Sequence, residues 1–341
     1  MIGIGLIGYG YWGPNLLRNF AEAPGCRVQM VSDLHPERLA QAQARYPMVK
    51  TTTNSRDVLT SPAIEVVAIA TPVSTHFEFA MQALQAGKHV WVEKPLTRTS
   101  EEAERLLDEA ARRRRLIMVD HTFTYTGAVR TIKELLEAGR IGQLYYYDSV
   151  RVNLGLFQHD VNVLWDLAVH DLAIMDYLLQ ARPCAVAATG MAHVAGQPEN
   201  TAYLTCFFET PLIAHFHVNW LSPVKIRRTL IGGDRQMIVY DDLEPSEKVK
   251  VYDKGITVNN GEGVYQLLVG YRTGDMWAPK LDLTEALRMA TLHFLECIQH
   301  QRQPLTDGQA GLRVVRLLET ATQSLAERGR PIDLAWERQP S

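Results

Sequence analysis

The chain has 341 residues, of which 46% are hydrophobic and 21% are charged, and its formal net charge at pH 7 is −3. This length exceeds one average domain, so two domains are expected. With 35 basic and 38 acidic residues, the charge balance does not favour nucleic acid or an anionic membrane as the main partner. We therefore expect a small-molecule site.

Membrane spans, export signals and metal sites are not predicted. The apolar runs are far shorter than a membrane-spanning helix, and the N-terminus enters a strand pattern without a basic leader segment. The four cysteines stand apart with no C-x-x-C pair, which is typical of buried thiols in a reducing compartment. We expect a cytoplasmic protein without a metal.

Short apolar runs alternate with helical patterns up to about residue 120. The apolar runs have strand character and cover residues 2–7, 27–31, 65–69, 89–92 and 116–119. The helical patterns cover residues 14–22, 36–46, 74–85 and 100–114. This alternation predicts a parallel sheet with crossover helices, that is, a doubly wound Rossmann domain over residues 1–122.

The pattern changes in the rest of the chain, which we assign to a second domain over residues 123–341. Helices are expected over residues 128–138 and 166–179, and strands over 144–152, 185–189, 202–208, 213–219, 228–231 and 237–240. Consecutive strands joined by short turns predict a large, mostly antiparallel open sheet with one free face, so the chain is of the α/β class. Residues 255–263 and 270–279 are expected to form turns and a loop, and two last helices, over 284–299 and 309–326, to pack back toward the first domain.

A glycine-rich segment, G-x-G-x-x-G, follows the first predicted strand and opens a helix. Gly8 would allow the tight turn, Gly10 would let a pyrophosphate approach the main chain, and Gly13 would let the helix pack against the strand. The helix N-terminus adds N–H groups and a positive dipole end. Tyr11 and Trp12 are expected to pack around this turn. Strand, glycines and helix together predict dinucleotide binding.

Asp33 ends the second predicted strand, where a carboxylate accepts hydrogen bonds from both hydroxyls of an adenosine ribose. The same carboxylate would repel the 2′-phosphate of NADP, so NAD is the expected cofactor. His35 and Arg38 lie close in sequence and keep NADP open as the alternative.

Two further polar segments follow predicted strands, at the edge where open α/β sheets bind ligands. The segment A-T-P (residues 70–72) precedes a helix that carries a histidine, and E-K-P (residues 93–95) follows the next strand. The residues expected to complete the cofactor site are Thr71, Pro72, His76, Glu93 and Lys94.

Four motifs in this order resemble the Gfo/Idh/MocA family, named after glucose-fructose oxidoreductase, inositol dehydrogenase and a rhizopine-catabolism protein. They are G-x-G-x-x-G, A-T-P followed by a histidine, E-K-P, and W-D-L-A-V-H-D at residues 165–171. Within the family, GYGYWGPNLLRNF, HTFTY and NLGLFQ-x-D-x-NVLWDLA-x-HD are similar to members associated with bacterial nucleotide-sugar metabolism. The resemblance spans nearly the whole chain.

The resemblance implies hydride transfer from a secondary alcohol to nicotinamide, with Lys94 beside the ring and Lys94–Pro95 as a cis peptide. Such a reaction needs a base for the hydroxyl proton and a cation for the developing alkoxide. His170 suits the base, because histidine has a reference pKa of about 6.5. Asp166 lies one helical turn earlier, where it could orient the imidazole or bind a substrate hydroxyl. The alternative is a surface lysine, an N-capping aspartate and a helix-face histidine.

Substrate contacts are expected around the catalytic helix and in a later loop. Arg151, Asn153 and Gln158 flank that helix and could bind hydroxyl or phosphate groups. Arg272 lies in the predicted loop Y-R-T-G-D-M-W-A-P, which could contact the nucleotide part of a substrate or a neighbouring subunit. The two alternating histidines of strand 213–219 have no evident carboxylate partner, so we do not predict a metal there.

Together these features predict an NAD-dependent dehydrogenase that oxidises a sugar hydroxyl, and the resemblance favours C3 of a UDP-linked amino sugar. An inositol or free-sugar dehydrogenase is the second enzyme hypothesis. A cofactor-sensing binding protein without turnover is the third, and the presence of Lys94, Asp166 and His170 argues against it. The resemblance also implies a homodimer or homotetramer whose partner covers the free face of the sheet.

Overall fold

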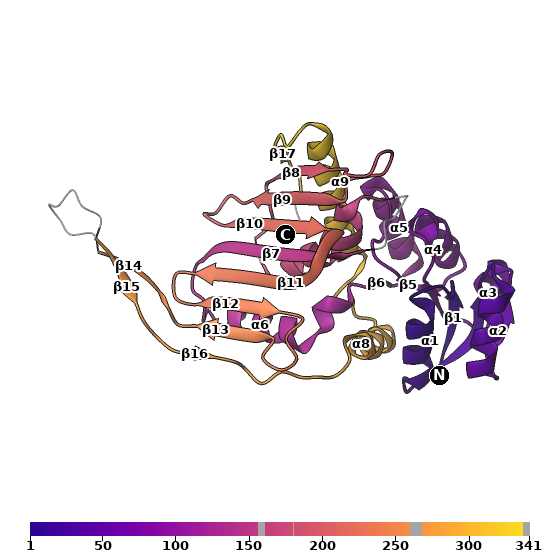
Figure 1. The fold of residues 1–341 in the computed structure, drawn as a ribbon. Coiled ribbons are helices and arrows are strands. Elements are labelled where there is room, and N and C mark those ends of the chain that lie inside the picture. Colours follow the sequence, from indigo (N-terminus) through magenta and orange to yellow (C-terminus); the bar gives the residue numbers. More distant parts are fainter. Residues whose placement is uncertain (156–160, 180, 260–267, 337–341) are drawn as a thin grey trace. The chain divides into compact units, whose positions relative to one another are not determined.

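The computed structural model describes residues 1–155, 161–179, 181–259 and 268–336. The chain divides into two compact units, which Figure 1 shows coloured along the sequence. The first unit comprises Met1–Thr126 and Thr284–Arg316, and the second comprises Gly127–Leu283 and Leu317–Ser341. No helix within the described ranges is long and apolar enough to cross a membrane.

The first unit contains a six-stranded sheet in which all neighbouring strands are parallel. Its order is β3-β2-β1-β4-β5-β6. The strands are β1 Ile2–Ile7, β2 Cys26–Ser32, β3 Lys50–Thr52, β4 Val66–Ile69, β5 His89–Val92 and β6 Ile117–Val119. Strands β2 and β3 lie on one side of β1, and β4, β5 and β6 lie on the other. The connections therefore diverge at the carboxyl end of β1, which is where doubly wound sheets bind ligands. The predicted Rossmann sheet is confirmed, with the short β3 in addition.

Helices cross between these strands, and local chemistry sets several of their ends. They are α1 Gly13–Glu22, α2 Pro36–Arg45, α3 Ser55–Thr60, α4 His76–Gln85, α5 Ser100–Arg113 and α8 Ala286–His300, with the 3₁₀ turns η1 Val73–Thr75 and η2 Thr122–Tyr125. Proline occupies the first turn of α1 and of α2, where its missing N–H costs no helical hydrogen bond. The side chain of Thr99 caps α5 by accepting from the Glu102 N–H at 3.2 Å.

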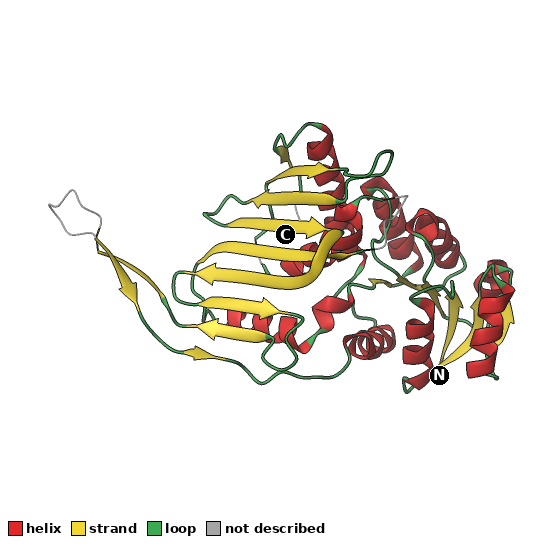
Figure 2. Cartoon of the chain, viewed as in Figure 1, coloured by secondary structure: helices red, strands yellow, loops and turns green. Residues whose placement is uncertain are grey.

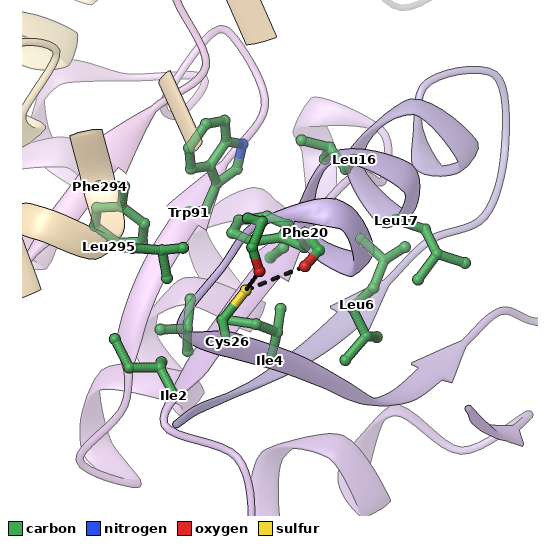
Figure 3. Packing of buried hydrophobic residues seen from close by; sticks show 14 of the residues in the cluster. Ile2, Ile4, Leu6, Leu16, Leu17, Phe20, Cys26, Trp91, Phe294 and Leu295 are labelled. Atoms are coloured by element: carbon green, nitrogen blue, oxygen red, sulfur yellow. Dashed lines mark hydrogen bonds between the residues drawn. The ribbon is translucent and has the colours of Figure 1, made fainter. Parts of the chain in front are cut away.

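The core of the first unit joins β1, α1 and α8 (Figure 3). Every residue of β1 is buried, as expected for a central parallel strand. The ring of Trp91 meets Phe20 edge-on at 5.4 Å and Phe294 at 5.7 Å between centroids. Because Phe294 lies on α8, this late helix is part of the N-terminal hydrophobic core.

The second unit contains a nine-stranded sheet of order β16-β13-β12-β11-β7-β10-β9-β8-β17. Its strands are β7 Leu144–Leu154, β8 Ala185–Met191, β9 Thr201–Phe207, β10 Ile213–Asn219, β11 Leu221–Gly233, β12 Met237–Asp241, β13 Val249–Tyr252, β16 Met276–Trp277 and β17 Ile332–Asp333. Of the strand pairs in the described part of this sheet, only β7 and β10 are parallel. The predicted fold class, a parallel Rossmann sheet followed by a mostly antiparallel sheet, is confirmed.

Among the described residues, helices cover one face of the second sheet and leave the other face uncovered. The helices are α6 Gly127–Glu137, a π-helical turn Leu164–Ala168 labelled η3, α7 Val169–Leu178 and α9 Gly308–Ala326, which continues from the first unit. In Figure 2 the helices lie behind the strands. Burial alternates accordingly, since Leu204 and Phe216 are buried whereas Tyr203 and Ile213 are 43% and 44% exposed.

The stretch predicted to be turns and a loop after residue 255 contains strands instead. Strands β14 Gly255–Asn259 and β15 Leu268–Arg272 form a separate two-stranded sheet, with Gly255 opposite Arg272. In Figure 1 this ribbon extends beyond the edge of the nine-stranded sheet. The prediction failed because glycines interrupt the apolar alternation, although main-chain pairing of the two segments needs no particular side chain.

Candidate active site

The glycine-rich turn has the shape that a dinucleotide requires. Gly8 has a φ of +95°, and a Cβ there would lie 2.4 Å from the carbonyl oxygen of Ala70. A Cβ on Gly13 would lie 2.5 Å from the Gly8 carbonyl oxygen. A Cβ on Gly10, by contrast, would meet only Arg38, at 3.7 Å. Gly8 thus permits the tight turn and Gly13 permits the packing of the helix, while Gly10 leaves the main chain open to a pyrophosphate.

The start of α1 adds an electrostatic attraction for that pyrophosphate. Trp12 is the N-cap residue, and its side chain makes no capping hydrogen bond. Pro14 has no N–H and the Asn15 N–H donates to the Trp12 carbonyl oxygen at 2.9 Å, so the attraction for an anion comes from the Gly13 N–H and the positive dipole end. Tyr11 is 93% exposed and stacks on Trp12 with 6.4 Å between ring centroids. These residues fit the pyrophosphate group of NAD.

Asp33 is held at the end of β2 by the main chain. Its Oδ2 accepts from the Tyr9 N–H at 2.6 Å and its Oδ1 accepts from the His35 N–H at 2.9 Å. The Nη1 atom of Arg38 lies 3.6 Å from Oδ2. A carboxylate oxygen accepts more than one hydrogen bond, so this fixed carboxylate also fits ribose hydroxyls.

His76 connects the two other motif segments. Its Nδ1 lies 2.8 Å from the carbonyl oxygen of Pro95, and its Nε2 lies 2.8 Å from that of Thr71. Two carbonyl acceptors favour a doubly protonated ring, whereas burial and the charge of Lys94 lower the pKa of His76. In the neutral ring one nitrogen donates at a time. Because the ring is only 1% exposed, we place His76 behind the two segments rather than on the cofactor.

The other predicted residues of these segments follow the ends of β4 and β5. The Thr71 hydroxyl accepts from Thr75 Oγ1 at 2.7 Å, and Pro72 leads into η1. The Lys94–Pro95 peptide is cis, which confirms the prediction. Burial, the nearby charge of Asp120 and a hydrogen bond to it raise the pKa of the Glu93 carboxyl group well above its usual range, although Lys94 opposes this.

Two polar residues after β6 were not predicted to belong to the site. Asp120 is 2% exposed and its Oδ2 accepts from Trp12 Nε1 at 2.8 Å. The ring nitrogens of His121 are buried and have no hydrogen-bond partner among the described residues. Burial, then Lys94 and Arg313, lower the pKa of His121 to about 3, so it is neutral at physiological pH. Their position after a strand, like that of E-K-P, was the signal that could have identified them.

The second unit holds Asp166 and His170 on a distorted helix. Asp166 lies in η3 and His170 in α7, so the segment is not the regular α-helix that was predicted. Such π-helical turns occur frequently at functional sites. The Asn162 side chain caps the segment by accepting from the Leu164 N–H at 3.1 Å. Oδ2 of Asp166 accepts from Trp220 Nε1 at 3.0 Å, which ties the carboxylate to the junction of β10 and β11.

Arg151 forms a buried ion pair inside the second unit. Its Nε and Nη2 atoms donate to the two carboxylate oxygens of Asp171, both at 2.8 Å, and both side chains are 4% exposed. Arg151 is therefore not among the residues that we propose as substrate ligands below. Asn153 is half-buried near the end of β7, Gln158 lies outside the described residues, and Arg272 ends β15.

A hollow of about 420 Å³ in the second unit lies away from these residues. It is lined by the last turns of α6 and α7, with Leu136 and Leu178 among its residues, and by Leu144 at the start of β7. Asn153 and His170 occupy the opposite ends of β7 and α7. The hollow is therefore no part of the candidate active site.

Comparisons with known proteins agree with this geometry. A family model described as "Oxidoreductase family, NAD-binding Rossmann fold" matches residues 2–121, and one described as "GFO/IDH/MocA C-terminal domain" matches residues 129–239. The chain belongs to the Gfo/Idh/MocA family. As a member it is an oxidoreductase that uses NAD, which the glycine turn and Asp33 fit.

Relatives of this Gfo/Idh/MocA chain act on sugars and polyols, as their names state. UDP-N-acetylglucosamine 3-dehydrogenase of Acidithiobacillus ferrooxidans is 29% identical, over 91% of this chain and 93% of the relative. A solved structure of that name has a TM-score of 0.80, with 26% identity over 96% of this chain and 99% of the other. The scyllo-inositol 2-dehydrogenase (NAD(+)) of Bacillus subtilis is 25% identical over 99% of this chain and 96% of the relative.

Proposed function

We propose that this protein oxidises a secondary hydroxyl of a nucleotide-linked sugar, specifically C3 of a UDP-linked amino sugar. The observation that carries the proposal is Lys94 at the carboxyl end of β5, in the same parallel sheet whose strand β1 leads into the glycine-rich turn, in a chain that also has Asp166 and His170. The similarity to UDP-N-acetylglucosamine 3-dehydrogenase supports the choice of substrate.

The proposed chemistry divides the alcohol proton and the hydride between different groups. When bound, NAD accepts the hydride from the carbinol carbon. His170 takes the hydroxyl proton, since a neutral imidazole with a reference pKa of about 6.5 is a base at physiological pH. The Lys94 ammonium group stabilises the negative charge that develops on the oxygen. Asp166, held by Trp220, binds a neighbouring sugar hydroxyl or orients the imidazole.

Substrate recognition is proposed for three positions that lie near the catalytic helix in sequence or in the later polar segment. Asn153 at the end of β7 and Gln158 would bind hydroxyl groups of the sugar, and Arg272 at the end of β15 would bind the diphosphate. The diphosphate is the part of a sugar nucleotide that inositols and free sugars lack. A role of Arg272 in substrate binding therefore distinguishes this proposal from the second hypothesis, an inositol or free-sugar dehydrogenase.

The test is NADH formation by the purified protein with NAD. UDP-N-acetylglucosamine and related sugar nucleotides are compared with inositols and free sugars, and product masses are determined. Turnover confined to a sugar nucleotide supports the proposal. Turnover of inositol or a free sugar moves the enzyme to the second hypothesis, which the similarity to scyllo-inositol 2-dehydrogenase favours.

A Lys94→Met variant tests whether the chain is a catalyst at all. An enzyme that uses the ammonium group is expected to lose most of its rate, on the order of a hundredfold or more, while still binding NAD. A cofactor-sensing protein would show no turnover in either form and an unchanged response to NAD.

We also propose a homo-oligomer in which a second copy covers the free face of the nine-stranded sheet. Tyr203 and Ile213 lie on that face and are more than 40% exposed, and an apolar sheet face of this kind is normally covered. Light scattering coupled to gel filtration gives the subunit number, and a monomer at micromolar concentration would contradict the proposal.

A further inference from the structure

Asp120 lies at the point where the glycine-rich turn meets the strand that leads to Lys94. Its main-chain N–H donates to the Val92 carbonyl at 2.8 Å, so it extends the pairing of β6 with β5 by one residue beyond the strand. Its side chain is 2% exposed. The proposed reaction gives this carboxyl group no chemical role.

Three side chains from separate segments donate to the Asp120 carboxyl group. Trp12 Nε1 donates to Oδ2 at 2.8 Å, and the Thr122 hydroxyl donates to Oδ1 at 2.6 Å. The Glu93 side chain is its third hydrogen-bond partner. A buried carboxylate is stable only when donors compensate its charge, and here three do so.

The direction of these bonds assigns the charge. An indole N–H only donates, so Trp12 requires Asp120 as the acceptor. Two carboxyl groups share a hydrogen bond only when one carries a proton. Both oxygens of Asp120 accept hydrogen bonds from other side chains, and burial and the adjacent Asp120 raise the pKa of Glu93 well above the usual range, so the shared proton is assigned to Glu93.

The partners of Asp120 belong to the two parts of the cofactor site. Trp12 is the N-cap residue of α1 and lies between Gly10 and Gly13. Glu93 immediately precedes Lys94. A displacement of Asp120 therefore moves the phosphate-binding turn and the lysine segment relative to each other.

We propose that Asp120 is a positioning residue for NAD: it locks the glycine-rich turn, through Trp12, to the E-K-P segment, through Glu93. The role assigned to Lys94 rests on the proposed function, whereas the effect on NAD binding does not.

The test is the dissociation constant for NAD measured by isothermal titration calorimetry without any sugar. Asp120→Asn removes the charge and Trp12→Phe removes one donor while keeping an aromatic ring. Each is expected to weaken NAD binding about tenfold, the effect of losing a hydrogen bond to a charged group. The double variant is expected to be little weaker than either single variant, because both changes act on the same charge-assisted hydrogen bond. Independent effects that multiply to about a hundredfold would overturn the proposal.

Trp336→Phe is the matched control. Its Nε1 donates to the Pro183 carbonyl at 2.6 Å within the second unit, so the same chemical change should leave NAD binding unaltered. If Asp120→Asn fails to fold, Trp12→Phe decides alone. An unchanged dissociation constant for Trp12→Phe, even with a lower melting temperature, would show a merely structural bond and overturn the proposal.

Infrared spectroscopy tests the assigned proton. The wild type at neutral pH is expected to show a carboxylic acid C=O band that Glu93→Gln removes. Absence of that band would mean an ionised Glu93 and would overturn the acceptor role of Asp120. These readouts need no sugar substrate, so a protein that behaves as predicted yet oxidises no sugar would refute the proposed function alone.

Discussion

The indole nitrogen of Trp220 donates a 3.0 Å hydrogen bond to Oδ2 of Asp166. Trp220 is fully buried where β10 passes into β11, and Asp166 lies in the π-helical turn before α7. The sheet of the second unit thus sets the direction of a carboxylate that the proposed chemistry needs.

Trp220→Phe should therefore damage catalysis more than cofactor binding. The phenyl ring keeps most of the packing but removes the N–H, so we expect kcat to fall about tenfold as the carboxylate loses its orientation. The KM for NAD should stay unchanged. Trp165→Phe is the control. Trp165 directly precedes Asp166 in the sequence, but its indole N–H donates to the Thr322 hydroxyl at 2.9 Å and not to Asp166. Equal kcat values for both variants would contradict an orienting role for Trp220.

Gly10→Ala should separate folding from cofactor binding. A Cβ at this position meets only Arg38, at 3.7 Å, so the melting temperature should change little. The added methyl group stands where the pyrophosphate approaches, and we expect NAD binding to weaken at least tenfold. Gly13→Ala, whose Cβ would lie 2.5 Å from the Gly8 carbonyl oxygen, should lower both stability and NAD binding. Titration calorimetry and thermal unfolding measure the two effects, and tight NAD binding by Gly10→Ala would sink the prediction.

The neutral form of His89 should make the protein acid-sensitive. Its Nδ1 accepts from the Leu116 N–H at 3.0 Å, and burial, then Arg115, lower its pKa to about 4. The unfolded chain binds the proton at about pH 6.5, so below that pH it holds more protons than the folded chain. Stability is then complete above about pH 6.5 and falls as the pH drops toward 4, by an amount on the order of 2 kcal/mol.

His89→Asn tests this dependence, because the amide oxygen can accept the same hydrogen bond but does not titrate. Urea unfolding at pH 7 and pH 5 should show a smaller loss of stability for the variant than for the wild type. His121, with a pKa of about 3, and His76, whose pKa burial also lowers, contribute to the loss of stability that remains. His35→Asn changes an exposed histidine and should leave the wild-type dependence intact. An equal loss in all three proteins would refute the assignment.

Asp171→Asn should destabilise the second unit without changing substrate affinity. The substitution leaves the buried Arg151 guanidinium without its counter-charge, and such a loss costs about 3 kcal/mol or more. Urea unfolding should show this loss, whereas the sugar KM of the remaining folded enzyme should stay within twofold. A raised KM with normal stability would restore Arg151 as a substrate ligand.

Arg272→Ala should raise the KM for a sugar nucleotide about tenfold, since a charge-assisted hydrogen bond to the diphosphate is lost. The KM for NAD should not change. Lys280→Ala removes an exposed cation further along the same segment and serves as the control. An unchanged KM for every tested sugar nucleotide would remove Arg272 from the substrate site.

Local patterns in the sequence were sufficient for the elements and for the cofactor turn. Strand β1 and the glycines that follow it depend on residues within a few positions of one another, so spacing alone predicted them. The acidic residue at the end of β2 was likewise recognised from its position after a predicted strand, whereas the cis Lys94–Pro95 peptide was implied by the family resemblance. The short β3 and the pair β14–β15 escaped because brief or glycine-interrupted segments carry little periodicity.

Only the tertiary structure decided how these local parts are used. Arg151 and Asp171 are 20 residues apart in sequence and form a buried ion pair that short-range patterns did not predict. Trp12 and Asp120, 108 residues apart, meet because β6 ends at the same edge of the sheet as β1. Side-chain pairing over such separations depends on strand order and register, which short-range patterns do not encode.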